Sequence, residues 1–333
     1  MKLIIQIPCL NEEITLPVTI RDLPTRIEGI REIEYLIIDD GSSDATVEVA
    51  KQLGVHHIVR FAKNKGLAEA FKAGLDASLK LGADIIVNTD ADNQYKGGDI
   101  PKLIEPILSG NYEMVIGDRK TETIAHFSPI KKKFQRFGSS VVRALSQTDI
   151  PDTTSGFRAY TRDAALRINV VSEFTYTLET IIQAGHKKIA VGHVEIGTND
   201  KLRDSRLFKS MSGYMRRSAK TIIRIYTMYR PMKVFVIGGA ISALLGILIG
   251  LRFLYFYFIE DGSGHIQSLI LSAVMMIVGF QLGILGVVAD LISNNRKLLE
   301  ESLYRIKKIE LKPETGMIES EEHQKPHKQK MIS

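Results

Sequence analysis

Cysteine and tryptophan are nearly missing from this chain of 333 residues, which has one cysteine, Cys9, and no tryptophan. A single cysteine excludes an internal disulfide and a zinc site built from several cysteines, and it fits a reducing compartment. The apolar start, residues 3–7, is too short for the core of a signal peptide and is typical of a strand. We therefore expect the first 230 or so residues to lie in the cytoplasm.

Charged residues are absent from two long stretches in the last third of the chain. Residues 234–251 are 18 residues without a charge, and residues 269–289 are 21 more. A helix needs about 20 apolar residues to cross a hydrocarbon core of about 30 Å. The sequence therefore predicts two transmembrane helices, residues 232–258 and 266–292, joined as a hairpin.

Acidic residues are scarce just before the first of these helices. Residues 203–233 contain nine Lys or Arg and one acid, Asp204, and residues 296–308 add five more Lys or Arg. The positive-inside rule places both flanks in the cytoplasm, so we expect a multi-pass protein of the plasma membrane. Residues 207–230 are predicted to form a basic amphipathic interfacial helix, and residues 293–333 a basic cytoplasmic tail with a disordered end. Nucleic acid is not expected as a partner, because no recognition motif accompanies the charge.

Short apolar runs alternate with helix-type segments over the first 120 residues. The runs are residues 3–7, 35–38, 58–61, 85–87 and 114–116. Residues 66–81 follow helical spacing, and such alternation predicts βαβ units around a mostly parallel sheet buried on both faces. Farther along, we expect helices at residues 130–146 and 174–184 and a strand at residues 189–196.

Polar residues follow three of the predicted strands, at the edge where open α/β sheets bind ligands. These ends are Asn11-Glu12-Glu13, Asp39-Asp40-Gly41-Ser42 and Asp90-Ala91-Asp92-Asn93-Gln94. A carboxylate such as Asp40 can accept hydrogen bonds from a ribose hydroxyl or a base N–H. Asp90 and Asp92 can face one hard divalent cation, with Gln94 as a third oxygen ligand shared with substrate phosphates. The structural alternative for each motif is a helix cap or an Asx turn.

In this order, the motifs resemble those of the family-two inverting glycosyltransferases, and most of all the polyprenyl-phosphate group that includes the dolichol-phosphate mannose synthases. The matching segments are Ile7-Pro8, Asn11-Glu12-Glu13, Asp39-Asp40-Gly41-Ser42, Asn64-Lys65-Gly66, Asp90-Ala91-Asp92 with Gln94, Gly117-Asp118-Arg119 and Thr154-Ser155-Gly156-Phe157-Arg158. The resemblance implies an α/β catalytic domain of GT-A fold, Rossmann-like with a mostly parallel sheet, over residues 1–206, followed by the transmembrane hairpin.

The resemblance also implies a role for particular residues. The nucleotide sugar would be bound by Pro8, Leu10, Glu12, Ile38, Asp40, Asp90, Ala91, Asp92, Arg203 and Arg206. Mg²⁺ or Mn²⁺ would be bound by Asp90, Asp92 and Gln94, and the acceptor phosphate by Arg119, Arg136 and Ser140. Catalysis would fall to Asp92, Arg119 and Asp152, the last of which matches an acid proposed as a base in the family.

The implied activity is inverting transfer of a sugar from a nucleotide diphosphate sugar, of GDP-mannose or UDP-glucose type, to dolichyl or undecaprenyl phosphate in the membrane. Because a phosphate monoester is already anionic, with a second pKa of about 6, Asp152 either removes a proton or orients the phosphate or an arginine. One alternative is transfer to a lipid or glycan hydroxyl, and another is a non-catalytic nucleotide-binding membrane protein. Processive polysaccharide synthases of the same broad family carry a Gln-x-x-Arg-Trp motif, which a chain without tryptophan cannot have.

Overall fold

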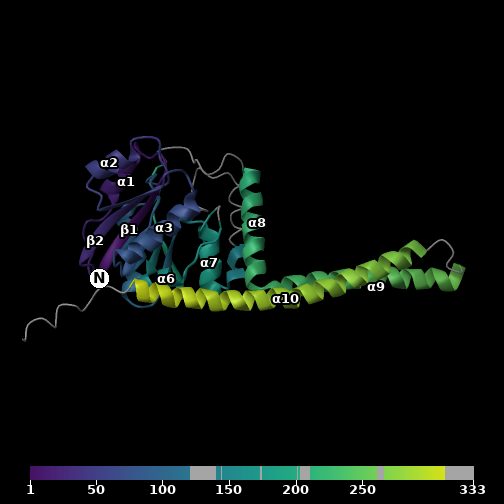
Figure 1. The fold of residues 1–333 in the computed structure, drawn as a ribbon. Coiled ribbons are helices and arrows are strands. Elements are labelled where there is room, and N and C mark those ends of the chain that lie inside the picture. The colour runs from purple at the N-terminus through teal and green to yellow at the C-terminus, as the bar shows by residue number, and fades with distance from the viewer. Residues whose placement is uncertain are drawn as a thin grey trace, which may run out of the picture.

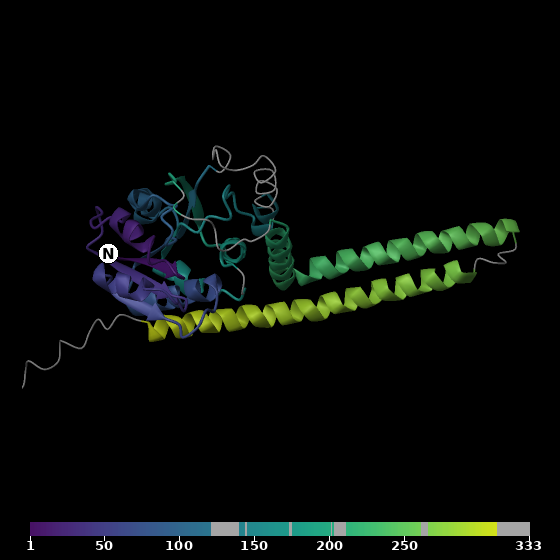
Figure 2. The ribbon, with the colours of Figure 1, turned by 90° about the horizontal axis from the view of Figure 1, so that it is seen from above.

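The protein consists of a globular domain from which two long helices project side by side (Figures 1 and 2). The computed structural model describes residues 1–120, 140–143, 145–172, 175–200, 202, 211–260 and 266–311. The expected disordered end, residues 312–333, lies outside the described residues.

In the described part of the chain, the domain is built on a 7-stranded sheet with the order β3-β2-β1-β4-β6-β5-β7. The strands are β1 (Lys2–Cys9), β2 (Glu32–Asp39), β3 (His57–Arg60), β4 (Ile85–Asn88), β5 (Met114–Asp118), β6 (Arg158–Thr161) and β7 (Val191–Glu195). β6 alone among them pairs antiparallel, with β4 on one side and β5 on the other, and the other pairs are parallel. The predicted α/β fold with a mostly parallel sheet is confirmed, and β6 is a strand that the sequence patterns did not predict.

Helices cover both faces of this sheet. They are α1 (Leu16–Asp22), α2 (Thr46–Gln52), α3 (Leu67–Lys80), the short 3₁₀ helix η1 (Gly97–Asp99), α4 (Ile100–Leu108), α6 (Arg162–Arg167) and α7 (Thr177–His186). In β1, Ile4 packs into the core that contains Phe71 of α3, whereas Leu3 and Ile5 pack into the core that contains Leu103 of α4. Burial on both faces explains why the strands are continuous apolar runs rather than alternating ones.

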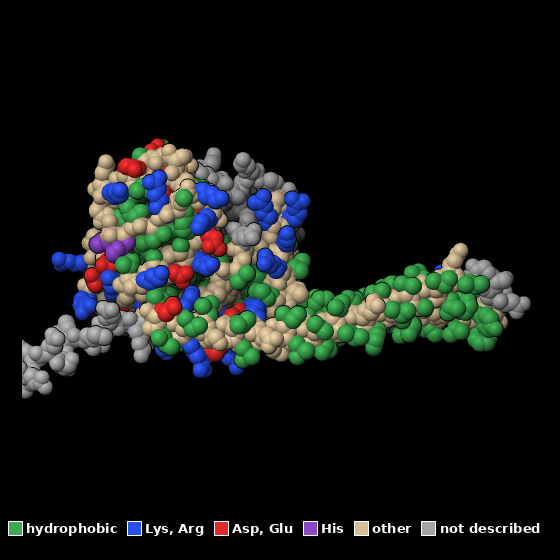
Figure 3. All heavy atoms as spheres, in the orientation of Figure 1, with side chains coloured by type: hydrophobic (Ala, Val, Ile, Leu, Met, Phe, Trp, Pro, Cys, Tyr) green, Lys and Arg blue, Asp and Glu red, His purple; other side chains and the backbone are tan. Residues whose placement is uncertain are grey.

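Three helices follow the domain: α8 (Met211–Tyr229), α9 (Pro231–Glu260) and α10 (Ile266–Glu310). Both α9 and α10 are long and apolar enough to cross a membrane, and apolar side chains cover the projecting hairpin (Figure 3). Residues 211–229 of the predicted interfacial helix are helical, and residues 207–210 lie outside the described residues. Of the helix predicted at residues 130–146, residues 140–143 and 145–146 are described and are helical.

Small residues bring α9 and α10 into close contact. A Cβ atom on Gly239 would lie 2.7 Å from the carbonyl oxygen of Gly279, and one on Gly279 would lie equally close to the carbonyl oxygen of Gly239. The Ser242 hydroxyl donates to the Met275 carbonyl at 2.8 Å, and the Ser272 hydroxyl donates to the Gly246 carbonyl at 2.6 Å. In lipid, helix association depends on such close packing and on interhelical hydrogen bonds.

α10 continues beyond the predicted transmembrane span at residues 266–292, without a break to Glu310. Contacts with the globular domain explain the continuation. Tyr304 donates to Asp163 of α6 at 2.6 Å, and Lys307 pairs with Asp76 of α3 at 3.0 Å. α10 therefore runs from the hairpin back along the domain, on the side seen below the sheet in Figure 1.

Candidate active site

The three polar motifs meet at one edge of the sheet. β1 pairs in parallel with both β2 and β4, with Cys9 opposite Asp39 and Gln6 opposite Asn88. The carboxyl ends of these strands therefore point the same way, and the segments that follow them start beside one another. The docked end of α10 lies at the opposite edge, since Asp84, just before β4, bonds to Lys2 at the start of β1 and to Arg162 at the start of α6.

Two neighbouring acids at the end of β2 have different surroundings. Asp39 is fully buried, accepts a hydrogen bond from the Ser42 amide at 3.0 Å and pairs with Arg60 at 3.1 Å. Asp40 accepts hydrogen bonds from the amides of Lys65 at 2.7 Å and Gly66 at 2.9 Å. Burial raises the pKa of Asp40 above its usual value, although these two bonds oppose the shift. Asp39 thus stabilises the turn, and Asp40 fixes the loop before α3.

A cavity of about 310 Å³ lies beside this strand end, lined by Gly41, Ser42, Arg60, Phe61 and Ala62. Gly41 has φ +75°, and a Cβ atom there would lie 2.6 Å from the carbonyl carbon of Lys63. A side chain at this position would therefore prevent the loop after β2 from lying so close to the loop before α3.

The end of β1 is joined to the end of β2 by side chains. The side-chain oxygen Oδ1 of Asn11 accepts a hydrogen bond from the Ser43 amide at 2.8 Å, and the Glu12 amide donates to the Thr46 hydroxyl at 2.8 Å. Glu12 is buried and accepts a hydrogen bond from Thr15. Of the other residues predicted to bind the nucleotide sugar, Pro8, Ile38 and Ala91 are buried and Leu10 is half-buried. The structure places all of them at or near the same edge, and their ligand contacts stay a prediction.

The predicted metal motif follows β4. Asp90, Asp92 and Gln94 are half-buried, and the Gln94 amide donates to Asp92 Oδ1 at 3.2 Å. A Cβ atom on Gly156 would lie 3.1 and 3.2 Å from the two carboxylate oxygens of Asp90, so the glycine makes room for this carboxylate. Within the described residues, no three His, Cys, Asp or Glu side chains gather as a metal site. Two carboxylates and an amide oxygen suit Mg²⁺ or Mn²⁺ only when substrate phosphates supply further ligands.

Arg119 and Asp152 form a two-pronged ion pair beside this motif. Arg119 donates to Asp152 through Nε at 2.6 Å and Nη2 at 3.0 Å, and Nη2 also donates to the Thr154 hydroxyl at 2.9 Å. Asp152 is 2% exposed. Burial raises its pKa, but the Arg119 charge and the hydrogen bonds from Arg119 and Thr154 outweigh burial and lower the pKa below its usual value. Asp152 is therefore poorly suited to take up a proton and well suited to orient Arg119.

Tyr95 links the metal motif to the loop that carries Asp152, a role that the sequence analysis missed. Its hydroxyl oxygen accepts a hydrogen bond from the Gly156 amide at 2.8 Å, and its ring stacks on Phe157 with centroids 5.1 Å apart. The Arg119 guanidinium lies 5.8 Å from the centre of the same ring. Burial raises the pKa of Tyr95 to about 12, so the hydroxyl stays protonated. The sequence offered one indication, an aromatic residue directly after Gln94.

Arg158, the last residue of the matched motifs, stabilises the loop between Asp152 and β6. It is fully buried and donates to the carbonyl oxygens of Thr153, Ser155 and Thr177. Asn88, at the end of β4, donates to the Gly156 carbonyl at 2.9 Å. The loop between Asp152 and β6 is therefore fixed by its own backbone carbonyl groups.

Not every predicted residue can be placed. Arg136, Arg203 and Arg206 lie outside the described residues, so their roles stay predictions. Ser140 lies in the described helical segment 140–143 and is exposed. The described residues bring together a carboxylate pair, a half-buried arginine and its buried acid, which is an arrangement that can bind two phosphate groups next to each other.

Comparison with known proteins identifies the family of this chain. The family described as "Glycosyl transferase family 2" matches residues 4–168. A UDP-N-acetylglucosamine–dolichyl-phosphate N-acetylglucosaminyltransferase of Methanococcus voltae is 30% identical over 58% of this chain and 83% of its own length. A dolichol-phosphate mannosyltransferase of Pyrococcus furiosus is 27% identical over 77% of this chain and 72% of its own length.

Solved structures agree on the fold. The crystal structure of glucosyl-3-phosphoglycerate synthase from Mycobacterium tuberculosis superposes with a TM-score of 0.54 at 19% identity, over 68% of this chain and 79% of that chain. Further crystals of that enzyme contain UDP with Mn²⁺ or Mg²⁺. The chain has the GT-A fold, and it belongs to glycosyl transferase family 2, a family of enzymes whose members similar to it include polyprenyl-phosphate sugar transferases.

Proposed function

We propose that this glycosyltransferase moves a sugar from a nucleotide diphosphate sugar to the phosphate of a membrane polyprenyl lipid, with inversion at the anomeric carbon. One observation carries the proposal: an arginine fixed by a buried acid, Arg119 with Asp152, lies beside the Asp90 motif in a domain joined to an apolar hairpin. The names of relatives from Methanococcus voltae and Pyrococcus furiosus, both dolichyl-phosphate sugar transferases, support it.

The donor would lie along the carboxyl edge of the sheet. Asp40 and the residues at the ends of β1 and β2 would bind the nucleoside, and the diphosphate would meet Asp90 and Asp92. These carboxylates, with Gln94, would hold Mg²⁺ or Mn²⁺, which supplies charge neutralisation to the departing nucleoside diphosphate. The Asp90 carboxylate packs so closely on Gly156 that a Cβ atom there would lie 3.1 Å from one of its oxygens, so the loop holds this carboxylate in place.

The acceptor phosphate would bind to Nη1 of Arg119, since Nε and Nη2 already donate to Asp152 and Thr154. A phosphate oxygen attacks the anomeric carbon from the face opposite the diphosphate, so the new C–O bond forms as the bond to the diphosphate oxygen breaks. The acceptor is a dianion above its second pKa of about 6, and no proton needs to be removed. Asp152 orients Arg119, and catalysis rests on positioning and charge stabilisation.

The membrane helices suit such an acceptor. A polyprenyl chain lies within the bilayer, and its phosphate is confined to the surface. A catalytic domain attached by α8, α9 and α10 stays at that surface, which raises the local concentration of acceptor. Arg136 and Ser140 are proposed as further phosphate ligands, and Arg203 and Arg206 as donor contacts, with the domain on the cytoplasmic side.

Transfer to a lipid or glycan hydroxyl is the second candidate, and it would need a base to remove the hydroxyl proton. The lowered pKa of Asp152 and its pairing with Arg119 do not favour that role.

A donor panel with the purified full chain tests the proposal. Radiolabelled GDP-mannose, UDP-glucose and UDP-N-acetylglucosamine are each incubated with a short polyprenyl phosphate or with the matching polyprenol. We expect label in an acid-labile lipid with the phosphate only, and no transfer by Asp92→Asn. Label in an acid-stable product with the polyprenol would contradict a phosphate acceptor, and unchanged transfer by Asp92→Asn would contradict the metal role.

A further inference from the structure

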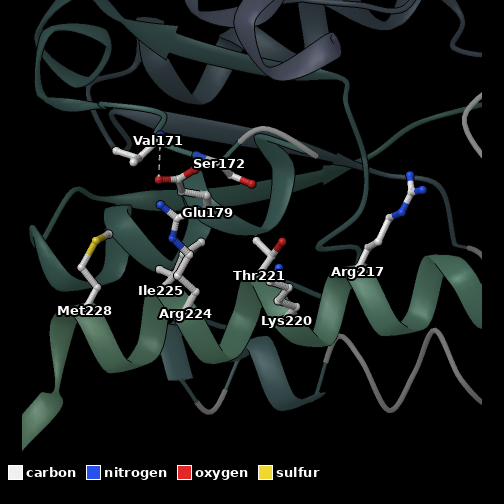
Figure 4. Close-up of a pocket in the computed structure, with 9 residues that line it drawn as sticks. All are labelled: Val171, Ser172, Glu179, Arg217, Lys220, Thr221, Arg224, Ile225 and Met228. Carbon is white, nitrogen blue, oxygen red and sulfur yellow. Dashed lines mark hydrogen bonds between the residues drawn. The ribbon is translucent and has the colours of Figure 1, made fainter.

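A second group of basic residues lies far from Arg119 in the chain, on α8. Between α8, α7 and residues 171–172 there is a cavity of about 190 Å³ (Figure 4). Arg217, Lys220 and Arg224 of α8 line it. Their spacing of three and four residues puts all three on one side of the helix. The function proposed above uses none of them.

The charges around this cavity are mostly positive. Among the residues that the structure describes, its lining contains these three cations and one acid, Glu179 of α7. The Glu179 carboxylate accepts hydrogen bonds from the amides of Val171 at 3.0 Å and Ser172 at 2.8 Å, so much of its capacity is used within the protein. Burial raises the pKa of Glu179 above its usual value. The hydroxyl groups of Ser172 and Thr221 also line the cavity and add uncharged donors. The cavity therefore favours an anion with several oxygen acceptors.

The position of α8 indicates where such an anion would come from. α8 ends at Tyr229, and the membrane-spanning helix α9 starts at Pro231. α8 stands nearly perpendicular to the hairpin (Figures 1 and 2), so it lies along the membrane surface when the hairpin crosses the bilayer. On the same helix Ile223 is 65% exposed, as expected for a helix in contact with the interface. The cavity is therefore at the depth of lipid headgroups, where anionic phospholipids concentrate.

We propose that this cavity binds the phosphate of an anionic phospholipid headgroup, with Arg217, Lys220 and Arg224 as its ligands. The bound lipid would fasten α8 to the bilayer surface, apart from the acceptor phosphate at Arg119. Binding needs neither donor nor metal, so it stands or falls independently of the proposed function.

Binding of fluorescent phosphatidylglycerol to the detergent-purified full chain measures this directly. Each basic residue near a surface contributes about 1 kcal/mol toward an anionic lipid, so R217Q/K220Q is expected to weaken binding by about 30-fold. The matched control is Arg216→Gln, a neighbouring exposed arginine of α8 that does not line the cavity, and its affinity should change little. If Arg216→Gln lost as much affinity per removed charge as R217Q/K220Q, the effect would come from general surface charge, and the proposal would be overturned.

Competition on the unmutated chain separates the possible sources of phosphate. Unlabelled phosphatidylglycerol should displace the probe, whereas phosphatidylcholine and inorganic phosphate should not. Displacement by polyprenyl phosphate at far lower concentration than by phosphatidylglycerol would assign the cavity to the acceptor and contradict the proposal. Lys220→Glu, which reverses one exposed charge, should also lose binding while its circular dichroism spectrum and unfolding temperature match those of Arg216→Gln.

Discussion

Replacing Asp152 with asparagine tests whether Asp152 acts as a base or positions Arg119. The side chain keeps its size and loses its charge, and its amide N–H₂ group would face the guanidinium of Arg119. In the present structure both carboxylate oxygens accept hydrogen bonds from Arg119, at 2.6 and 3.0 Å. The substitution therefore releases the arginine without emptying the space that the acid fills.

The expected magnitude follows from the burial of this pair, whose side chains are 16% and 1% exposed. Removing one partner of a buried ion pair costs about 3–5 kcal/mol, because the other charge stays buried and unpaired. A loss of about 1.4 kcal/mol is a tenfold change in rate. If the misplaced arginine weakens binding of the transition state by the same 3–5 kcal/mol, kcat/KM falls by about 150- to 5,000-fold.

A double-mutant cycle with Arg119→Ala and Asp152→Ala tests the connection. If Asp152 acts through Arg119, the double variant is no slower than Arg119→Ala alone. If Asp152 is an independent base, the two losses multiply, and that result would refute the positioning role.

The pH dependence of kcat/KM gives a second test. Because the pKa of Asp152 is lowered, its carboxylate is ionised throughout about pH 5 to 8 and adds no titration there. We expect one rise near pH 6, where the acceptor loses its second proton. A second change in the pH profile of kcat/KM that disappears in Asp152→Asn would contradict the positioning role of Asp152.

Two further predictions use pairs of glycines with opposite surroundings. Gly156→Ala places a methyl group 2.9 Å from the Tyr176 hydroxyl and 3.1 Å from an Asp90 carboxylate oxygen, whereas nothing lies within 4 Å of the same methyl in Gly98→Ala. We expect a weaker apparent affinity for Mn²⁺ in transfer assays with Gly156→Ala and an unchanged value with Gly98→Ala; equal values in both would show that Asp90 is not confined by the loop. Gly239→Leu should separate α9 from α10 and cost about 1–3 kcal/mol, whereas Gly283→Leu faces open space. A drop in unfolding temperature in detergent for the first variant alone is the expected result.

The fold was predictable where local pattern and burial agree. β1 and β4 are continuous apolar runs because both faces of the sheet are covered, and such runs are visible in the sequence. β6 was missed because it starts with Arg158, a charged residue that is usually exposed. This arginine is buried because carbonyl groups from two other segments surround it, and only the folded chain brings them there.

The candidate site also combines features that the sequence predicts with features that only the folded chain shows. The acids at the strand ends were predictable, since βαβ topology itself aligns the carboxyl ends. The pairing of Arg119 with Asp152 joins residues 33 positions apart, and sequence reasoning left open whether the acid is a base or an orienting group. Asp39 and Asp40 are adjacent and chemically identical, yet one pairs with Arg60 and the other binds the loop before α3. Such differences depend on the direction of each side chain, which the alternation along a strand predicts. They also depend on the neighbouring side chains, which the alternation does not predict.

The end of α10 was expected to be a tail because its charge resembles that of a flank outside the membrane. Its charged residues, however, are spaced four apart, as in a helix. Arg296 pairs with Glu300, and Glu301 pairs with Arg305. Such pairs add only about 0.3–0.5 kcal/mol each. The contacts of Tyr304 and Lys307 with the domain supply further stabilisation.

The corner between α8 and α9 connects the domain to the apolar hairpin. A helix end leaves carbonyl groups without partners, and at the end of α8 the Met228 carbonyl accepts a hydrogen bond from the Ser293 hydroxyl of α10 at 3.0 Å. The Arg296 guanidinium lies 4.0 Å from the centre of the Tyr229 ring, and this ring stacks on His186 of α7. Burial, with the nearby charges of Arg296 and two other basic residues, lowers the pKa of His186 to about 4.

His186 is therefore neutral between about pH 5 and 8, where an ordinary histidine would titrate. A proton on this ring would add a fourth positive charge beside Arg230, Arg296 and Lys297 and would force the corner apart. Because the ring stays neutral across this range, protonation of His186 does not disturb the packing of α7 against α8 and α10 there. We therefore expect the ionisation of the proposed acceptor phosphate, and not a titration at this corner, to set how transfer depends on pH.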